Sequence, residues 1–102
     1  MPKVIVLYPT PTDVDAFERV YRDEHAPMVH ANMPGLKKFV AARVTGSPAG
    51  PAPYGRVAEL YFDSTDAMQR ALATPGAQAT VAHAMQISTG GPITVLFAED
   101  DA

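Results

Sequence analysis

The segment FERVYRDEHAPMVHANMPG, residues 17–35, organises the chain. Four of its residues recur at spacings of four, four and three, which predicts one stripe of an amphipathic helix: Phe17, Tyr21, His25 and Met28. Three of them are typical core residues, but His25 is ionisable. Pro27 removes a backbone hydrogen bond two residues later, so we expect the helix to break beside His25. An ionisable group directed at the interior beside irregular backbone is the leading functional candidate.

The sequence around this segment alternates between strand and helix patterns. Runs of β-branched and aromatic residues predict strands at residues 3–8, 36–45, 54–62 and 93–98. Thr12 or Asp13 would cap the first helix, which we expect from about Val14 to about Ala26. A broken extension over residues 27–34 would follow it.

A second helical region follows the third strand. Residues 63–66, DSTD, provide an N-terminal cap. Thr74-Pro75 predicts a restart, because threonine is a good cap and proline suits the first helical position. We expect this region to end near Ile87, before a glycine-rich turn over residues 88–91. Residues 46–53 predict a loop, and we expect the acidic tail, residues 99–101, to fray.

The resulting order of elements is β-α-β-β-α-β, the ferredoxin-like or split βαβ arrangement. It predicts an α+β fold with a four-stranded antiparallel sheet and both helices on one face. At 102 residues the chain has the length of one domain, which we expect to span residues 1–102.

The strands carry apolar residues on both faces of the predicted sheet. In the first strand Val4, Val6 and Tyr8 alternate with Ile5 and Leu7. Nothing else in the chain could cover the second face, so we expect a homodimer that packs sheet against sheet around a two-fold axis. The alternative is a monomer with a large exposed apolar patch, which soluble monomers seldom tolerate.

Composition narrows the classes of function. Hydrophobic residues make up 47% and charged residues 19%, which is typical of a folded globular protein. The net charge is −3 and no basic patch occurs, so we expect no nucleic-acid partner. The absence of cysteine excludes disulfides and thiolate ligands. No signal peptide or membrane-length apolar run occurs, and we expect a soluble, cytoplasmic protein with no membrane partner.

Several segments resemble the EthD family of dimeric α+β barrel proteins. They are FERVYRDEHAPM and MPGLKKF, after a strand ending Leu-Tyr-Pro, and later GRVAELYFDSTDAMQRALATPGAQA and STGGP. The most specific piece is the pattern aromatic–x3–His–x–Pro formed by Tyr21, His25 and Pro27. The resemblance implies ferredoxin-like protomers that pair sheet to sheet around a central barrel. It also implies that His25 opens towards a pocket between helix and sheet.

The resemblance leaves the reaction class open. The family is named for a member associated with alkyl ether degradation. The wider superfamily includes muconolactone isomerases, polyketide cyclases and dehydratases, and cofactor-free monooxygenases, which implies a small organic substrate. Some barrel relatives bind haem through a histidine, but nothing in this sequence beyond the single residue His83 points to haem.

Three residues are the candidates for catalysis. His25 could act as general acid or base, or it could cap a backbone group that Pro27 leaves unpaired. Tyr21, one turn earlier, could bond to His25 or to a ligand, or simply pack. Glu59 is a charged residue in an apolar strand; it could be a second proton-transfer group, or it could form an ion pair with Arg43 or Arg56.

Other residues carry weaker signals. The aromatic side chains of Tyr8, Phe39 and Tyr61 could line a pocket or belong to the core. His30 and His83 have no spacing that supports a metal site, and Ser88-Thr89-Gly90-Gly91 is not a phosphate-binding loop. We therefore expect no metal and no cofactor.

The leading hypothesis is a small homodimeric, cofactor-free enzyme acting on an apolar or aromatic organic compound. His25 would transfer a proton, with Tyr21 and Glu59 orienting the substrate. Isomerisation, cyclisation or dehydration beside a carbonyl, and oxygenation without a cofactor, all remain open. The alternatives are a non-catalytic protein that binds a small hydrophobic metabolite and an accessory protein of an oxygenase system.

Overall fold

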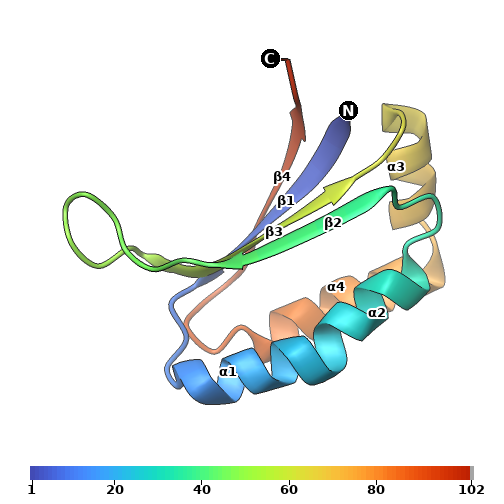
Figure 1. Ribbon diagram of the computed structural model, residues 1–102. Coiled ribbons are helices and arrows are strands. Elements are labelled where there is room, and N and C mark those ends of the chain that lie inside the picture. Colours follow the sequence, from blue (N-terminus) through green and yellow to red (C-terminus); the bar gives the residue numbers. More distant parts are fainter. Residues whose placement is uncertain (102) are drawn as a thin grey trace.

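A computed structural model describes residues 1–101 and has the predicted α+β architecture (Figure 1). The strands are β1 (Pro2–Pro9), β2 (Lys38–Arg43), β3 (Tyr54–Tyr61) and β4 (Thr94–Glu99). They form one antiparallel sheet in the order β2-β3-β1-β4. The helices are α1 (Val14–Val20), η1 (Tyr21–His25), α2 (Ala26–Asn32), α3 (Thr65–Leu72) and α4 (Pro75–Ile87).

All four strands differ from their expected bounds, by one or two residues at one or both ends. The second strand, expected at residues 36–45, is limited to Lys38–Arg43. It starts late because the N–H of Leu36 bonds to the carbonyl of Met33 in a turn. The last strand runs to Glu99, one residue further than expected.

The acidic tail does not fray at residues 99 and 100. Glu99 belongs to β4, and the carboxylate of Asp100 lies 2.9 Å from Nζ of Lys3. The expected fraying is therefore wrong for these two residues, because the pairing of β4 with β1 brings Asp100 beside a cation.

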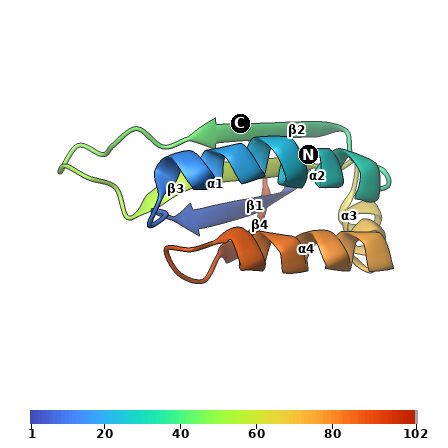
Figure 2. The same cartoon turned by 90° about the horizontal axis from the view of Figure 1, so that it is seen from below.

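The helices cover one face of the sheet and leave the other open (Figure 1). Viewed from the helix side, α1–α2 and α4 run alongside each other with β1 visible between them (Figure 2). The core lies between the covered face and the helices, and the strands contribute Val4, Tyr8 and Leu60 to it. The covered and open faces follow the predicted alternation along β1.

The sequence predicts a break in the first helix beside Pro27, but this prediction is wrong, because the helix continues past the proline. Helix α1 continues through a π-helical segment, η1, into α2, which ends at Asn32. In η1 the N–H of Ala26 bonds to the carbonyl of Tyr21, five residues earlier. Pro27 lies in the first turn of α2, where a missing N–H is tolerated. The π-turn thus absorbs the proline without ending the helix.

The π-turn also changes which residues face the sheet. Met28 was expected on the buried stripe, but Val29 is buried there instead, followed by Met33. A π-turn holds one residue more than an α-turn, so each inward position after it lies one residue later. The buried stripe therefore reads, at a constant spacing of four, Phe17, Tyr21, His25, Val29 and Met33.

The expected helix caps are present. Side-chain oxygens of Asp13, Ser64 and Thr74 accept hydrogen bonds from the backbone at the starts of α1, α3 and α4. After α4 the chain turns tightly at residues 88–91, as expected. A Cβ on Gly90 would lie 2.0 Å from the carbonyl oxygen of Thr10, so this close approach requires glycine.

Candidate functional site

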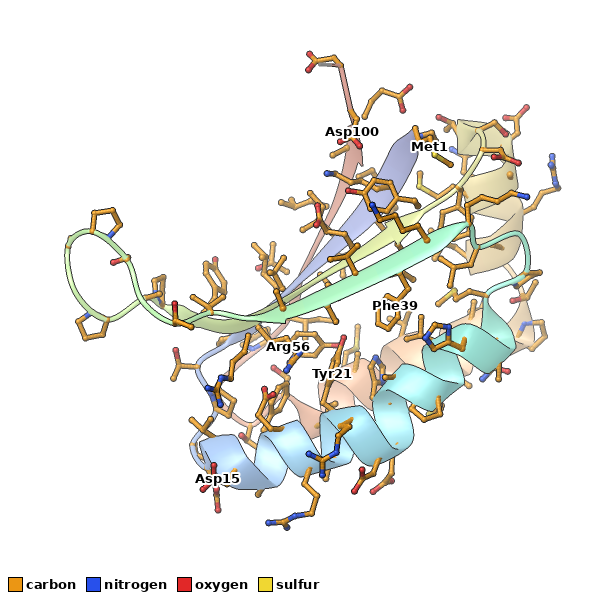
Figure 3. The ribbon with its side chains drawn as sticks, viewed as in Figure 1. Met1, Asp15, Tyr21, Phe39, Arg56 and Asp100 are labelled. Carbon is orange, nitrogen blue, oxygen red and sulfur yellow. The ribbon has the colours of Figure 1, made fainter. Side chains whose placement is uncertain are left out.

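A cavity of about 350 Å³ lies between the sheet and the helices. Its wall is almost entirely apolar and includes side chains from the strands and from the helices, such as Val6, Val29, Phe39, Leu60 and Ile93. Figure 3 shows Tyr21 directed up from the helices and Phe39 directed down from β2 towards this space. The few polar side chains on the wall include Tyr8, Tyr21 and His25.

His25 lies in η1 and is only 4% exposed. Its Nε2 is 3.2 Å from the hydroxyl of Tyr8, and its Nδ1 is 2.9 Å from Nδ1 of His83. Burial, and secondarily the nearby His83, lowers the pKa of His25 to about 4. His25 is therefore a neutral imidazole at pH 7.

The bonding of His25 excludes one of the two roles that the sequence left open for it. Both of its ring nitrogens bond to side chains, and it makes no side-chain capping bond at the start of α2. Capping a backbone group beside Pro27 is therefore wrong as an explanation of this residue. The reason is that the π-turn, and not the imidazole, accommodates the proline.

Tyr8 comes from the central strand β1 and is the nearest polar neighbour of His25 on the cavity wall. Its side chain is fully buried, and burial raises its pKa well above the usual range of tyrosine. The hydroxyl is thus protonated and can donate to Nε2 of His25. The sequence suggested Tyr8 only as a lining aromatic residue, and the bond to His25 adds a polar role.

Tyr21 also lines the cavity, but it does not bond to His25. Its buried hydroxyl has no hydrogen-bond partner among the residues that the structure describes. Burial raises the pKa of Tyr21 to about 12, an increase that the neighbouring Arg56 partly offsets. A protonated, buried hydroxyl without a partner is uncommon in folded proteins, and it is available to a ligand oxygen.

Arg56 supports Tyr21 from the side of the sheet. Its guanidinium carbon lies 4.4 Å from the centre of the Tyr21 ring (Figure 3). The same guanidinium forms a two-pronged ion pair with the carboxylate of Glu18 on α1. This cluster ties β3 to the helix layer and holds the Tyr21 ring in place.

Glu59 lies on the open face of the sheet, away from the cavity and from His25. Its carboxylate is 2.8 Å from Nζ of Lys3. The expected pairing with Arg43 or Arg56 is wrong for a geometric reason. Arg56 lies an odd number of residues from Glu59 in β3, and Arg43 is the cross-strand partner of Arg56, so both share the other face.

The remaining sequence candidates divide between the two faces. Phe39 lines the cavity as proposed, whereas Tyr61 lies on the open face beside Lys3. His30 on α2 is exposed, and its ring lies edge-on to that of Phe39, with the ring centres 5.2 Å apart. Within residues 1–101, no group of three or more histidine, aspartate or glutamate side chains could hold a metal ion.

His83 is a residue of this site for which the sequence gave only a weak signal, and its approach to His25 was not predicted. It lies on α4, 58 positions from its hydrogen-bond partner His25. The βαββαβ order places the two helices side by side on one face, so a close approach of their histidines was open to inference. No local spacing pattern joins residues so far apart, which is why the pair was missed.

Comparison with known proteins identifies the family. The model of the EthD domain matches residues 9–86 of the chain. The chain belongs to the EthD family. It is 31% identical over 101 residues to an uncharacterised 11.0 kDa protein of Rhodococcus erythropolis, covering 99% of this chain and 96% of that protein.

Solved structures of EthD-like proteins have the same fold. A crystal structure of an EthD family protein from Bacillus halodurans is similar over 99% of both chains, with a TM-score of 0.91 and 33% identity. A cofactor-independent oxygenase from Streptomyces nogalater, SnoaB, has a TM-score of 0.68 and 20% identity over 99% of this chain and 93% of its own. The latter likeness is one of fold alone.

In the part of the chain that the structure describes, no helix has the length and apolar character needed to cross a membrane.

Proposed function

We propose that this EthD-family chain is an acid–base enzyme acting on a small, largely apolar organic compound that carries a carbonyl or enol oxygen. The convergence of three neutral polar groups on one apolar cavity carries this proposal. The cavity, at about 350 Å³, lies within the range of small-molecule sites in proteins. Perturbed ionisable groups in such a cavity are typical of functional sites.

Each of the three groups has a distinct role in the proposal. The free hydroxyl of Tyr21 donates a hydrogen bond to the ligand oxygen and stabilises the negative charge that develops there. The neutral pair formed by Tyr8 and His25 removes a proton from the adjacent carbon. Returning that proton to another atom gives isomerisation, loss of a neighbouring hydroxyl group as water gives dehydration, and attack of the carbanion on a second carbonyl of the same molecule gives cyclisation.

Oxygenation is compatible with the same first step. A carbanion stabilised in an apolar cavity can react with oxygen directly, and SnoaB, which shares this fold, is a cofactor-independent oxygenase. The proposal therefore commits to proton abstraction beside an oxygen and leaves the fate of the carbanion to experiment. Glu59 has no part in it, because its carboxylate pairs with Lys3 on the opposite face.

The proposed enzyme is a homodimer that packs through the open face of the sheet. Apolar side chains on this face include Ile5, Leu7, Val57 and Leu96, and no element among residues 1–101 covers them (Figure 1). Leu96 is 46% exposed. Sheet-to-sheet packing of two copies would remove this apolar surface from water.

A binding protein is the second candidate, and one observation favours it. Both ring nitrogens of His25 already have partners within the chain, so a ligand would compete for them. In this case the cavity would hold a hydrophobic metabolite without changing it. The accessory role in an oxygenase system is a variant of this candidate.

The test uses β-tetralone, an aromatic ketone with acidic protons beside its carbonyl. We expect the wild-type protein to accelerate exchange of those protons with deuterium in heavy water, followed by NMR. His25→Gln should lower the exchange rate by at least about a hundredfold, the usual contribution of a general base. His30→Gln, at an exposed histidine on the same helix, should leave it unchanged.

Two results would overturn the enzymatic proposal. Binding of β-tetralone without any acceleration of exchange would support the binding protein instead. Equal exchange in the wild type and in His25→Gln would remove the proton-transfer role of His25. Thermal melting of each variant shows that its fold is retained.

A further inference from the structure

His83 links the buried site to the surface of the molecule. Its Nδ1 lies 2.9 Å from Nδ1 of His25, and the two ring planes are within 12° of each other. Its other nitrogen, Nε2, lies 3.9 Å from a carboxylate oxygen of Glu24, whose side chain is 64% exposed. The side chain of His83 is itself partly exposed, and it is absent from the cavity wall.

The hydrogen-bond pattern fixes a direction along this row of groups. Only one of the two facing Nδ1 atoms can carry a proton, because a hydrogen bond needs one donor and one acceptor. When the Tyr8 hydroxyl donates to His25, the ring proton of His25 must be on Nδ1 and is donated to His83. The proton of His83 then lies on Nε2, on the side of the Glu24 carboxylate, which at 3.9 Å is an ionic neighbour and not a hydrogen-bond partner.

His25 is a poor place for a positive charge, and His83 is a better one. Burial and the neighbouring ring of His83 both oppose protonation of His25. The groups around His25 are Tyr8 from β1, Tyr21 from its own element and His83 from α4, and none is an anion. Among residues 1–101, the carboxylate that lies within 4 Å of either ring is that of Glu24, next to His83.

We propose that His83 relays protons between the Tyr8–His25 pair and solvent. As a substrate carbon gives its proton to the Tyr8 oxygen, the Tyr8 proton moves to Nε2 of His25 and the His25 proton moves from Nδ1 to Nδ1 of His83. The products are a substrate anion, held by Tyr21, and an imidazolium at His83 beside Glu24. His25 remains neutral throughout, and reversing the steps returns a proton to the substrate.

This relay rests on the proposed function, but part of its test does not need a substrate. Nitrogen-15 NMR of the free protein reports which ring nitrogen of each histidine carries the proton. We expect His25 to be protonated on Nδ1 and His83 on Nε2. The opposite assignment for either ring would overturn the proposed direction, even if the protein proved to have no enzymatic activity.

The second part uses β-tetralone exchange with His83→Gln. A glutamine carbonyl can still accept the bond from His25, but it cannot take up a proton. We expect exchange about 10- to 100-fold slower than in the wild type, unchanged binding of β-tetralone, and partial recovery when imidazole is added to the buffer. His30→Gln serves as the matched control at a histidine outside the row.

The outcomes separate the relay from the proposed function. Undiminished exchange in His83→Gln would overturn the relay while leaving His25 as the base. A loss that added imidazole does not restore would also overturn it, since His83 would then have a structural role. Absence of exchange in the wild type would instead refute the proposed function.

Discussion

On the covered face of the sheet, the ionisable side chains that line the cavity are buried and neutral, whereas on the open face Lys3, Glu59 and Asp100 are charged and paired. Tyr8, Tyr21 and His25 all have pKa values displaced by burial towards the uncharged form. On the open face Lys3 bonds to Glu59 and Asp100, and this ammonium holds the pKa of Asp100 below its usual range.

This difference between the two faces indicates which ionisable residues are the better functional candidates. Neutral polar groups inside an apolar cavity reduce stability unless they are bonded, and one of these hydroxyls has no partner. Exposed ion pairs contribute little to stability and are common on any protein surface. A charged residue within an apolar strand is thus a weaker functional signal than a neutral group whose pKa burial has displaced.

The largest expected effect comes from a substitution that disrupts the proposed dimer interface on the open face. Leu7→Lys adds a charge to the middle of this face in both copies of the proposed dimer. We expect the dissociation constant to rise by about a thousandfold, or about 4 kcal/mol, because two ammonium groups would lose their hydration. Sedimentation velocity over a dilution series measures it.

Gln69→Lys provides the control for this variant. It adds the same charge at an exposed position on α3, outside the sheet, and should leave the dimer intact. A monomeric wild type at micromolar concentration, or a Leu7→Lys protein that stays dimeric, would contradict the sheet-to-sheet interface.

The next effect concerns pH and the covered face. An ordinary histidine has a pKa of 6.5, whereas the pKa of His25 in the folded chain is about 4. Between pH 4 and pH 6.5 the unfolded chain therefore binds more protons at this residue than the folded chain does. The free energy of unfolding should therefore fall as pH drops from 6.5 to 4, by on the order of 3 kcal/mol at most. This contribution is fully present above pH 6.5.

Urea unfolding across this range measures the effect. His25→Gln should remove this part of the pH dependence, and His30→Gln, at an exposed position, should retain it. If the unfolding free energy of His25→Gln depended on pH as strongly as that of the wild type, protonation of His25 would not be the cause of the acid destabilisation.

The smallest effect concerns the open-face ion pair. At concentrations where the protomers are separate, Glu59→Gln should lower the urea midpoint only slightly, and high salt should reduce the difference from the wild type, because the pair with Lys3 is only partly buried in one protomer. Asp63→Asn, which removes the exposed partner of Lys37, provides a comparison. A large, salt-independent loss would show that Glu59 is held in a buried setting such as the dimer interface.

Most of the fold could be predicted from the sequence. The alternation along Val4, Ile5 and Val6 separates the two faces, and Asp13 and Thr74 mark helix starts, because these signals are local. The continuation of the first helix past Pro27 could not be predicted. In an ideal α-helix a proline leaves one backbone carbonyl without its N–H partner, which predicts a break at Pro27. In the π-turn the N–H of Ala26 bonds to a carbonyl five residues earlier instead of four, so this prediction does not apply.

The candidate site was predicted only in part. The helical spacing identified His25 and Tyr21, which do line the cavity. The partners of His25 were missed because Tyr8 and His83 come from other elements, and their approach depends on how α4 and β1 pack against η1. The misassigned partner of Glu59 followed from comparing charges without comparing the faces on which they lie.

The π-turn has a consequence for how the length of this chain can vary. A repeat of four residues drifts by about 40° per step on an ideal α-helix, so five such positions could not all face one side. The wider turn at Tyr21–His25 corrects the drift and keeps Phe17 and Met33 on the same side. Relatives that lack one residue in this segment would form an ordinary α-turn there and still direct the counterparts of Val29 and Met33 at the sheet, so an alignment gap at Tyr21–His25 marks loss of the π-turn and not a rotated helix.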